Sequence, residues 1–183
     1  MYLWWIGEGP TDERMIQEVR AFVEGVFGLP VEIWKGSDRP ADTFDPARRQ
    51  HSSSLILRRL LGTRPQGAEK ILALTDADLF IPVLTFVFGE AQLEGTAAVV
   101  STARLARNPD GALANRRLFT LRLAKECVHE LGHTFGLVHC ADRRCVMARA
   151  ASLFDVDAKR SVLCRECRLR FRELRERGGE AYE

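Results

Sequence analysis

The chain has 183 residues, of which 46% are hydrophobic and 28% charged, and its formal net charge is +2. This length can hold one domain with a sizeable core, and the composition is ordinary for a soluble globular protein. No apolar run approaches the ~20 residues of a membrane-spanning helix, which excludes that class, and the net charge argues neither for nor against a polyanionic partner.

We expect no targeting segment at the start of the chain. Residues 1–6 are apolar, but they are too short for a signal-peptide core, carry no basic start and run into Glu8. We therefore expect the protein in the cytoplasm, where disulfides are disfavoured and grouped cysteines indicate metal binding. We also expect a single domain over residues 1–183, acting as a monomer without a membrane or nucleic-acid partner.

Strand-like and helix-like segments alternate over the first two-thirds of the chain. An apolar run at 2–6 predicts a buried strand. A first helix is predicted after Gly9-Pro10, because proline suits the first turn and Asp12 and Glu13 favour the positive end of the helix dipole. It ends near Gly28, and its apolar face carries Met15, Val19, Phe22, Val23 and Val26.

The same alternation continues toward the C-terminus. A strand at 31–34 leads through a polar stretch to a helix at about 46–62, with Leu55, Ile56 and Leu60 directed inward. Further strands are predicted at 71–75, 84–88 and 97–102, and a helix at about 117–135. The remaining residues are irregular and rich in cysteine, so we expect an α/β lobe followed by a small C-terminal segment.

Two short patterns have a structural and a functional interpretation. Gly7-Glu8-Gly9 follows a strand as in a nucleotide-binding loop, but the third glycine is missing, which favours a tight turn. Asp76 and Asp78 end a strand and could bind a hard cation such as calcium. A turn with local hydrogen bonds from side chain to backbone is the favoured interpretation.

The most specific pattern in the chain is HExxHxxGxxH over residues 129–139. With these residue frequencies it arises by chance about once in 10⁵ such chains. Three of the chain's four histidines belong to it. The residues that fill the defined positions are His129, Glu130, His133, Gly136 and His139.

The spacing of the pattern suits one catalytic zinc ion. Residues four apart lie on the same face of a helix, so His129 and His133 can share an ion. Glu130 is rotated by about 100° and is better placed to contact a metal-bound water. Gly136 can adopt the left-handed conformation that ends a helix, which lets His139 supply a third ligand from outside it.

Three neutral imidazoles leave the fourth tetrahedral position open to water, as in catalytic rather than structural zinc sites. A helix with three core histidines is disfavoured, because the glutamate and the glycine are in register as well. A zinc site without catalysis remains an alternative.

Four cysteines follow the histidine pattern: Cys140, Cys145, Cys164 and Cys167. Their spacing, C-x₄-C and C-x₂-C, fits a closed zinc site with four thiolate ligands, whereas two disulfides are disfavoured in the cytoplasm. Because Cys140 directly follows His139, the two residues should serve two separate ions, and the cysteine site should clamp the segment that carries His139. Cys127 is expected to be a buried core thiol.

The histidine pattern followed by Met147 resembles the metzincin clan of zinc metallopeptidases, in which a methionine turn forms an apolar floor below the zinc. The longer pattern HExxHxxGxxHC-x₄-C-x-M-x₁₆-C-x₂-C is similar to the archaemetzincins, a family with a catalytic zinc and a second, four-cysteine zinc site. It covers residues 129–167, about a fifth of the chain. Residues 74–79 and 86–91 look similar to segments of that family. Unlike in some metzincins, no tyrosine lies near Met147.

The resemblance implies an α/β fold, or α+β in stricter schemes. It implies a metzincin-like, mixed and mostly parallel five-stranded sheet with helices, an active-site helix and a small irregular C-terminal zinc-bound subdomain. The N-terminal lobe would span about 1–136 and the C-terminal lobe about 137–183. An antiparallel edge strand, for which 84–88 is the candidate, would bind extended peptide by main-chain pairing.

The resemblance also implies the function of a zinc-dependent peptidase. His129, His133 and His139 would bind a catalytic zinc, and Glu130 would act as general base and acid on a peptide or protein substrate. The four cysteines would bind a structural zinc.

Two alternatives to this function stay open at this point. One is a metzincin-like scaffold that binds a peptide or protein without turnover. The other is a nucleic-acid-binding zinc module, suggested by the arginines at 165–177. Glutamates interleave with those arginines, which favours a solvated, ion-paired helix face.

Overall fold

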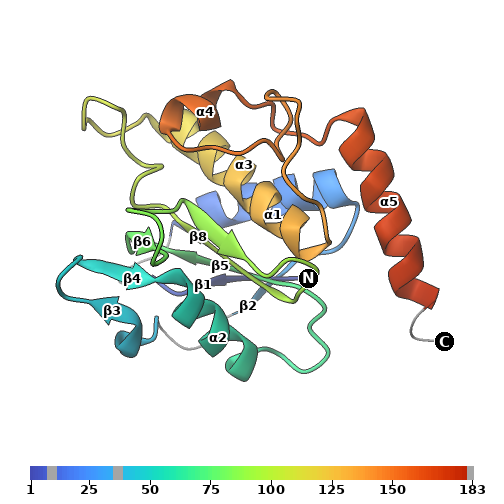
Figure 1. The fold of residues 1–183 in the computed structure, drawn as a ribbon, viewed down its shortest axis with the longest axis horizontal. Coiled ribbons are helices and arrows are strands. Elements are labelled where there is room, and N and C mark those ends of the chain that lie inside the picture. Colours follow the sequence, from blue (N-terminus) through green and yellow to red (C-terminus); the bar gives the residue numbers. More distant parts are fainter. Residues whose placement is uncertain (8–11, 35–38, 181–183) are drawn as a thin grey trace.

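The computed structural model describes residues 1–7, 12–34 and 39–180. Its centre is a five-stranded sheet in the order β2-β1-β5-β8-β7 (Figure 1). Four strands are parallel, and β7 runs antiparallel to β8 at one edge. The strands span Tyr2–Trp5 (β1), Glu32–Trp34 (β2), Ile71–Thr75 (β5), Gly89–Ala91 (β7) and Ala97–Ser101 (β8). The expected mixed, mostly parallel sheet is therefore confirmed.

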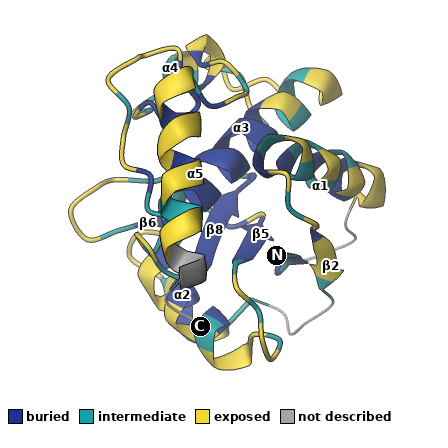
Figure 2. Cartoon of the chain, turned by 90° about the vertical axis from the view of Figure 1, so that its right-hand side faces the viewer, coloured by how far each residue is buried: buried dark blue, intermediate teal, exposed yellow. Residues whose placement is uncertain are grey.

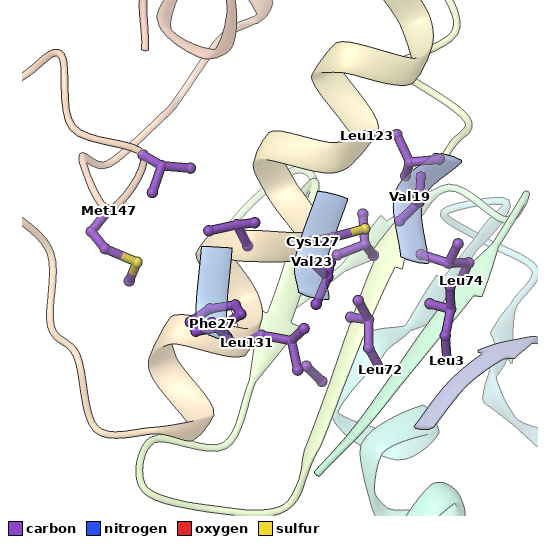
Figure 3. Packing of buried hydrophobic residues seen from close by; sticks show 14 of the residues in the cluster. Leu3, Val19, Val23, Phe27, Leu72, Leu74, Leu123, Cys127, Leu131 and Met147 are labelled. Carbon is purple, nitrogen blue, oxygen red and sulfur yellow. The ribbon is translucent and has the colours of Figure 1, made fainter. Parts of the chain in front are cut away.

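Helices cover both faces of this sheet, as a buried parallel sheet requires. On one face lie α1 (Glu13–Phe27) and α3 (Arg116–Thr134), and on the other lies α2 (Ser53–Thr63) (Figure 1). Side chains along β5 alternate between the two cores: Leu72 and Leu74 pack with α1 and α3, while Ile71 and Ala73 pack with α2. Figure 3 shows the first core, in which side chains of α1, α3, β1 and β5 meet.

The ends of α1 agree with the sequence. The Asp12 side chain accepts a hydrogen bond from the Met15 amide at 3.0 Å and caps the start of the helix. Gly28 ends it with a left-handed φ of 66°. The Gly9-Pro10 signal and most of Gly7-Glu8-Gly9 lie outside the described residues.

A second, small sheet stands beside the main one. It has the order β3-β4-β6, with β3 at Phe44–Asp45, β4 at Gln50–Ser52 and β6 at Leu79–Phe80, and a short 3₁₀ helix at Ala41–Thr43 precedes it. The predicted helix at 46–62 is therefore wrong in its first part. Gln50–Ser52 is extended because β4 pairs with β6, and Ser52 then caps α2 through the Leu55 amide. On that helix Leu57 is buried in place of Leu55.

The predicted strand at 84–88 is also wrong. Within this segment Val87 makes one isolated bridge to Leu79, and the edge strand begins only at Gly89. The edge strand begins there because the free edge of β8, at Ala98–Val100, pairs with Gly89–Ala91.

The C-terminal part contains α4 (Leu153–Ala158) and α5 (Arg165–Glu180), and residues 135–152 contain no helix or strand. Phe171 of α5 packs against Phe27 and Phe135 with ring centroids 5.2 and 5.1 Å away. The outward face of α5 is exposed (Figure 2). Among the described helices, none has the length and apolar character that crossing a bilayer requires.

Candidate active site and metal centres

Helix α3 carries the first part of the histidine pattern and begins and ends within one residue of the prediction. Asn115 caps its start by accepting a hydrogen bond from the Leu118 amide at 2.9 Å. Leu123, Cys127 and Leu131, each four residues apart, are buried in the core shared with α1 and the sheet (Figure 3). Cys127 is thus a core thiol, as expected.

His129 and His133 point their Nε2 atoms at each other, 3.1 Å apart. The Nδ1 atom of His129 lies 2.9 Å from the Val146 carbonyl oxygen, and that of His133 lies 2.7 Å from the Leu137 carbonyl oxygen. A carbonyl oxygen only accepts, so both Nδ1 atoms carry the hydrogen. In the neutral ring Nε2 then presents a lone pair, so the two facing Nε2 atoms are placed to share one metal ion.

His139 joins the pair from beyond the helix. The chain leaves α3 at Phe135 and turns at Gly136, whose φ is 90°, as the sequence predicted. One ligand atom from each of the three histidines lies within 4.8 Å of the others. Tetrahedral zinc with ordinary Zn–N bonds separates two nitrogens by about 3.3 Å, so the site fits such an ion.

The surroundings keep these rings in the form that binds metal. Burial lowers the pKa of His129 well below its ordinary value. Burial also lowers the pKa of His133 and that of His139, which is the most exposed of the three. Neutral imidazoles are the ligand form, so little competition from protons is expected near pH 7.

Glu130 lies beside this site with only 6% of its surface exposed. Burial raises the pKa of its carboxyl well above the ordinary value, and the negative charges of Glu126 and Glu90 act in the same direction. A carboxylate of raised basicity is better suited to accept a proton near neutral pH.

A cleft of about 320 Å³ runs past these residues. One wall is formed by residues 84–89 and another by 149–151, and His129, Glu130 and His139 also line it. The segment 84–88 therefore lies where the sequence placed the substrate strand, although it does not form one.

The four cysteines form a second cluster, with their sulfur atoms within 4.8 Å of one another. All five cysteines of the chain are described and have free thiols. The Cys140 and Cys164 sulfurs are 3.8 Å apart. Tetrahedral zinc with Zn–S bonds near 2.3 Å separates two sulfurs by about 3.8 Å, so this cluster fits zinc as well.

The cysteine cluster lies at the start of α5. The amide of Cys164 donates to the Cys145 sulfur at 3.3 Å, and the amide of Cys167 donates to the Cys164 sulfur at 3.5 Å. Burial raises the pKa of Cys164, but hydrogen bonds from the Cys167 amide and from the neighbouring thiols outweigh burial, so the pKa is lowered. Burial raises the pKa of Cys145 and Cys167, so a bound cation would be needed to ionise the whole set.

Met147 connects the two clusters. It is fully buried, and its backbone carbonyl accepts a hydrogen bond from the Cys140 amide at 2.9 Å. Its sulfur packs so closely on Gly132 of α3 that a Cβ atom there would lie 2.4 Å away. The turn at Met147 thus lies directly against the helix turn between His129 and His133.

The model of peptidase family M54 matches residues 63–173, more than half of the chain. An archaemetzincin of Methanopyrus kandleri is 41% identical over 173 residues, covering 94% of this chain and 95% of its own. The chain belongs to the archaemetzincin family. An archaemetzincin of Methanocaldococcus jannaschii is 35% identical over 170 residues, covering 93% and 90% of the two chains. The crystal structure of the Methanopyrus kandleri archaemetzincin matches with a TM-score of 0.84 at 34% identity and covers 96% of both chains.

Membership in this metalloprotease family confirms the resemblance seen in the motif. Several residues that shape the archaemetzincin site were nevertheless missed by sequence reasoning. Arg122, Lys125 and Glu126 precede the motif on α3 and are 1%, 4% and 2% exposed. Charged residues on a helix usually face solvent, and no signal in the sequence marks these three as buried.

Their partners lie more than 30 residues later, at the end of α4. Arg122 forms two hydrogen bonds to the Asp157 carboxylate at 2.7 and 2.6 Å. Lys125 donates to the Val156 and Asp157 carbonyls. Lys159 lies 3.0 Å from Glu126 in a fully buried ion pair. These contacts fasten the C-terminal part of the chain to the active-site helix.

Asp76 and Asp78, the candidate cation ligands, form ion pairs with arginines. Arg104 donates to both oxygens of Asp78 at 2.7 and 2.8 Å, and Arg39 donates to Asp76 at 2.6 Å. Ion pairs therefore hold the expected turn. The local hydrogen bond between side chain and backbone is made by Thr75, whose hydroxyl accepts from the Ala77 amide at 3.2 Å.

Proposed function

We propose that this archaemetzincin hydrolyses peptide bonds with zinc held by His129, His133 and His139 and with Glu130 as general base and acid. One observation carries the proposal. The Nε2 atoms of His129 and His133 face each other 3.1 Å apart while both Nδ1 atoms are already bonded, and Glu130 lines the same cleft. This arrangement supports a bound cation with a carboxylate beside it.

Zinc, when bound, supplies a Lewis acid that polarises a carbonyl and acidifies water. The chain supplies the rest. The Val146 and Leu137 carbonyls hold the two imidazoles in orientation, and Met147 provides the apolar floor. Glu130 would take the proton of the attacking water and deliver it to the leaving amine, a contribution typically worth about 10²–10⁴-fold in rate.

The cleft supports an extended peptide as substrate. It runs along the segment that leads into β7, and no strand among the described residues pairs with the outer side of β7. Unpaired amides and carbonyls of an edge strand can pair with the main chain of a bound peptide. Side-chain recognition would then come from the cleft walls at 84–89 and 149–151.

We further propose that Cys140, Cys145, Cys164 and Cys167 hold a second, structural zinc. Their sulfur spacing and the amide hydrogen bonds to Cys145 and Cys164 support a closed thiolate site. A cytoplasmic location, a monomeric state and a boundary between lobes near residue 136 remain part of this proposal.

The α5 arginines do not favour a nucleic-acid-binding module. Arg170 pairs with Glu173 and Arg175 with Glu69. These ion pairs support the solvated helix face that the sequence predicted.

The test combines metal analysis of the purified protein with digestion of a peptide library. We expect two zinc equivalents and cleavage, and we expect Glu130→Ala to keep both zinc ions while turnover falls about 10²–10⁴-fold. Glu176→Ala, on the exposed face of α5, serves as the matched control and should retain full activity. Zinc-loaded protein that cleaves no peptide would indicate a binding scaffold, and unchanged activity of Glu130→Ala would remove Glu130 from the mechanism.

A further inference from the structure

Gly89, the first residue of β7, is enclosed by the active-site helix and the neighbouring strand. A Cβ atom on Gly89 would lie 2.7 Å from Glu130 Cγ, 2.9 Å from Glu130 Oε1 and 2.7 Å from the Val99 carbonyl oxygen. Non-bonded carbon atoms prefer a separation of about 3.5–4.0 Å. Even a methyl group at this position therefore overlaps the Glu130 side chain.

The need for glycine at this position arises from space and not from backbone conformation. The glycines with positive φ in the described residues are Gly28, Gly67, Gly111 and Gly136. Gly89 instead pairs with Val100 in the regular antiparallel ladder between β7 and β8. An alanine can adopt that backbone, so substitution tests the contact with Glu130 without imposing a forbidden dihedral angle.

Strand β7 is also fixed on its opposite face, so it cannot easily retreat. The hydroxyls of Ser53 and Ser54, at the start of α2, donate hydrogen bonds to the Glu90 carboxylate. At the start of the strand, the Ser101 amide donates to the Phe88 carbonyl at 2.8 Å. The strand is thus held between α2 and β8. A larger residue 89 would meet both the Val99 carbonyl, which belongs to the β8 backbone, and the Glu130 side chain, and of these two groups the side chain is the one that can rotate away.

We propose that Gly89 is a positioning residue, whose missing side chain sets where the Glu130 carboxylate lies against the edge of the sheet. Its consequence for turnover rests on the proposed function, in which Glu130 transfers protons. A Cβ atom at residue 89 would displace Glu130 by about 1 Å, and misplacement of that size can lower a rate about 10²-fold. We therefore expect Gly89→Ala to lose about that factor in kcat while it keeps its zinc.

A double-mutant cycle on thermal stability tests the contact without using activity. Gly89→Ala should lower the melting temperature of the zinc-loaded protein by about 4–8 °C, because overpacking a tight contact is destabilising. In a Glu130→Ala background, which removes Cγ and the carboxylate, less than half of this loss should remain, namely the part due to the Val99 carbonyl. In a Glu130→Gln background, which keeps the same shape, the full loss should remain.

Gly25→Ala is the matched control, because a Cβ on this glycine of α1 would meet nothing within 4 Å. It should keep both kcat and the melting temperature or raise the latter slightly. An equal loss in all three Glu130 backgrounds, including a complete failure of both Gly89→Ala and Gly89→Ala/Glu130→Ala to fold, would overturn the proposal. So would a Gly89→Ala protein with wild-type kcat. If the protein cleaves no peptide at all, the proposed function fails, and the stability cycle still decides whether Gly89 positions Glu130.

Discussion

The histidine cluster and the cysteine cluster begin on adjacent residues but are built in different ways. Two of the three histidines lie on α3, a helix buried along most of its length, and backbone carbonyls fix their rings. Two of the four cysteines lie in residues 135–152, which have no regular structure. Of the other two, Cys164 directly precedes α5 and Cys167 lies in its first turn. We therefore expect the fold itself to organise the first cluster, and the second to depend on a bound metal for its order.

The largest effect should come from breaking the cysteine cluster. Metal binding to a structural thiolate site is coupled to about 10–16 kcal/mol of folding free energy. Cys164→Ser should therefore lower the melting temperature more than any of the other single substitutions, with loss of one zinc equivalent and weaker binding of the other. Hydrogen exchange should show residues 140–152 losing protection while α3 keeps it.

Cys127→Ser is the matched control for Cys164→Ser. It also replaces a thiol by a hydroxyl, at a core position outside the cluster. It should lower the melting temperature but leave both zinc equivalents bound. A Cys164→Ser protein with wild-type melting temperature and full zinc content would contradict the view that this metal clamps the segment carrying His139.

The sequence predicted the features that depend on local spacing and missed those that depend on partners elsewhere in the fold. Helix α3 and both ligand sets were predicted because each depends on spacing within a short stretch, which helix geometry or metal geometry converts directly into position. The edge strand was misplaced because Phe86, Val87 and Phe88 have high strand propensity, whereas Gly89–Ala91 does not. Only pairing with the next strand, β8, selects the latter.

The buried charges of α3 were missed for a related reason. Arg122 and Glu126 look like solvent-facing residues until Asp157 and Lys159 are brought against them. Those partners lie 35 and 33 residues away in the sequence. No local pattern encodes such a pairing, so tertiary packing alone decides whether a charged helix residue is buried.

The next largest fall in melting temperature should come from breaking the buried ion pair between Glu126 and Lys159. This pair connects α3 to the C-terminal part of the chain without a metal. Lys159→Met leaves the Glu126 carboxylate buried without its partner, which typically costs about 3–5 kcal/mol. In a chain of this size that is a fall in melting temperature of roughly 6–20 °C. Thermal unfolding monitored by circular dichroism measures the shift.

Arg170→Met provides the comparison, because it breaks the exposed pair with Glu173 and should cost no more than about 1 kcal/mol. If the shift for Lys159→Met were as small as that for Arg170→Met, the buried pair would contribute little, and the Arg122 and Lys125 contacts or a bound metal would hold the C-terminal part against α3. The combined variant Glu126→Leu/Lys159→Met should recover much of the lost stability, since it leaves no unpaired charge.

The smallest shifts in melting temperature should show that α3 and the loop that presents Cys145 differ in their dependence on zinc. The Asn115 side chain caps α3, and the Asp142 side chain accepts the Arg144 amide at 2.9 Å in the loop that presents Cys145. Asn115→Ala and Asp142→Ala should each cost about 1 kcal/mol, or roughly 2–4 °C, in the zinc-loaded protein. After chelation the shift for Asn115→Ala should persist, because α3 stays folded. The shift for Asp142→Ala should vanish, because its loop is then already disordered. A shift for Asp142→Ala that survives chelation would mean that the fold, and not the metal, orders the cysteine loop.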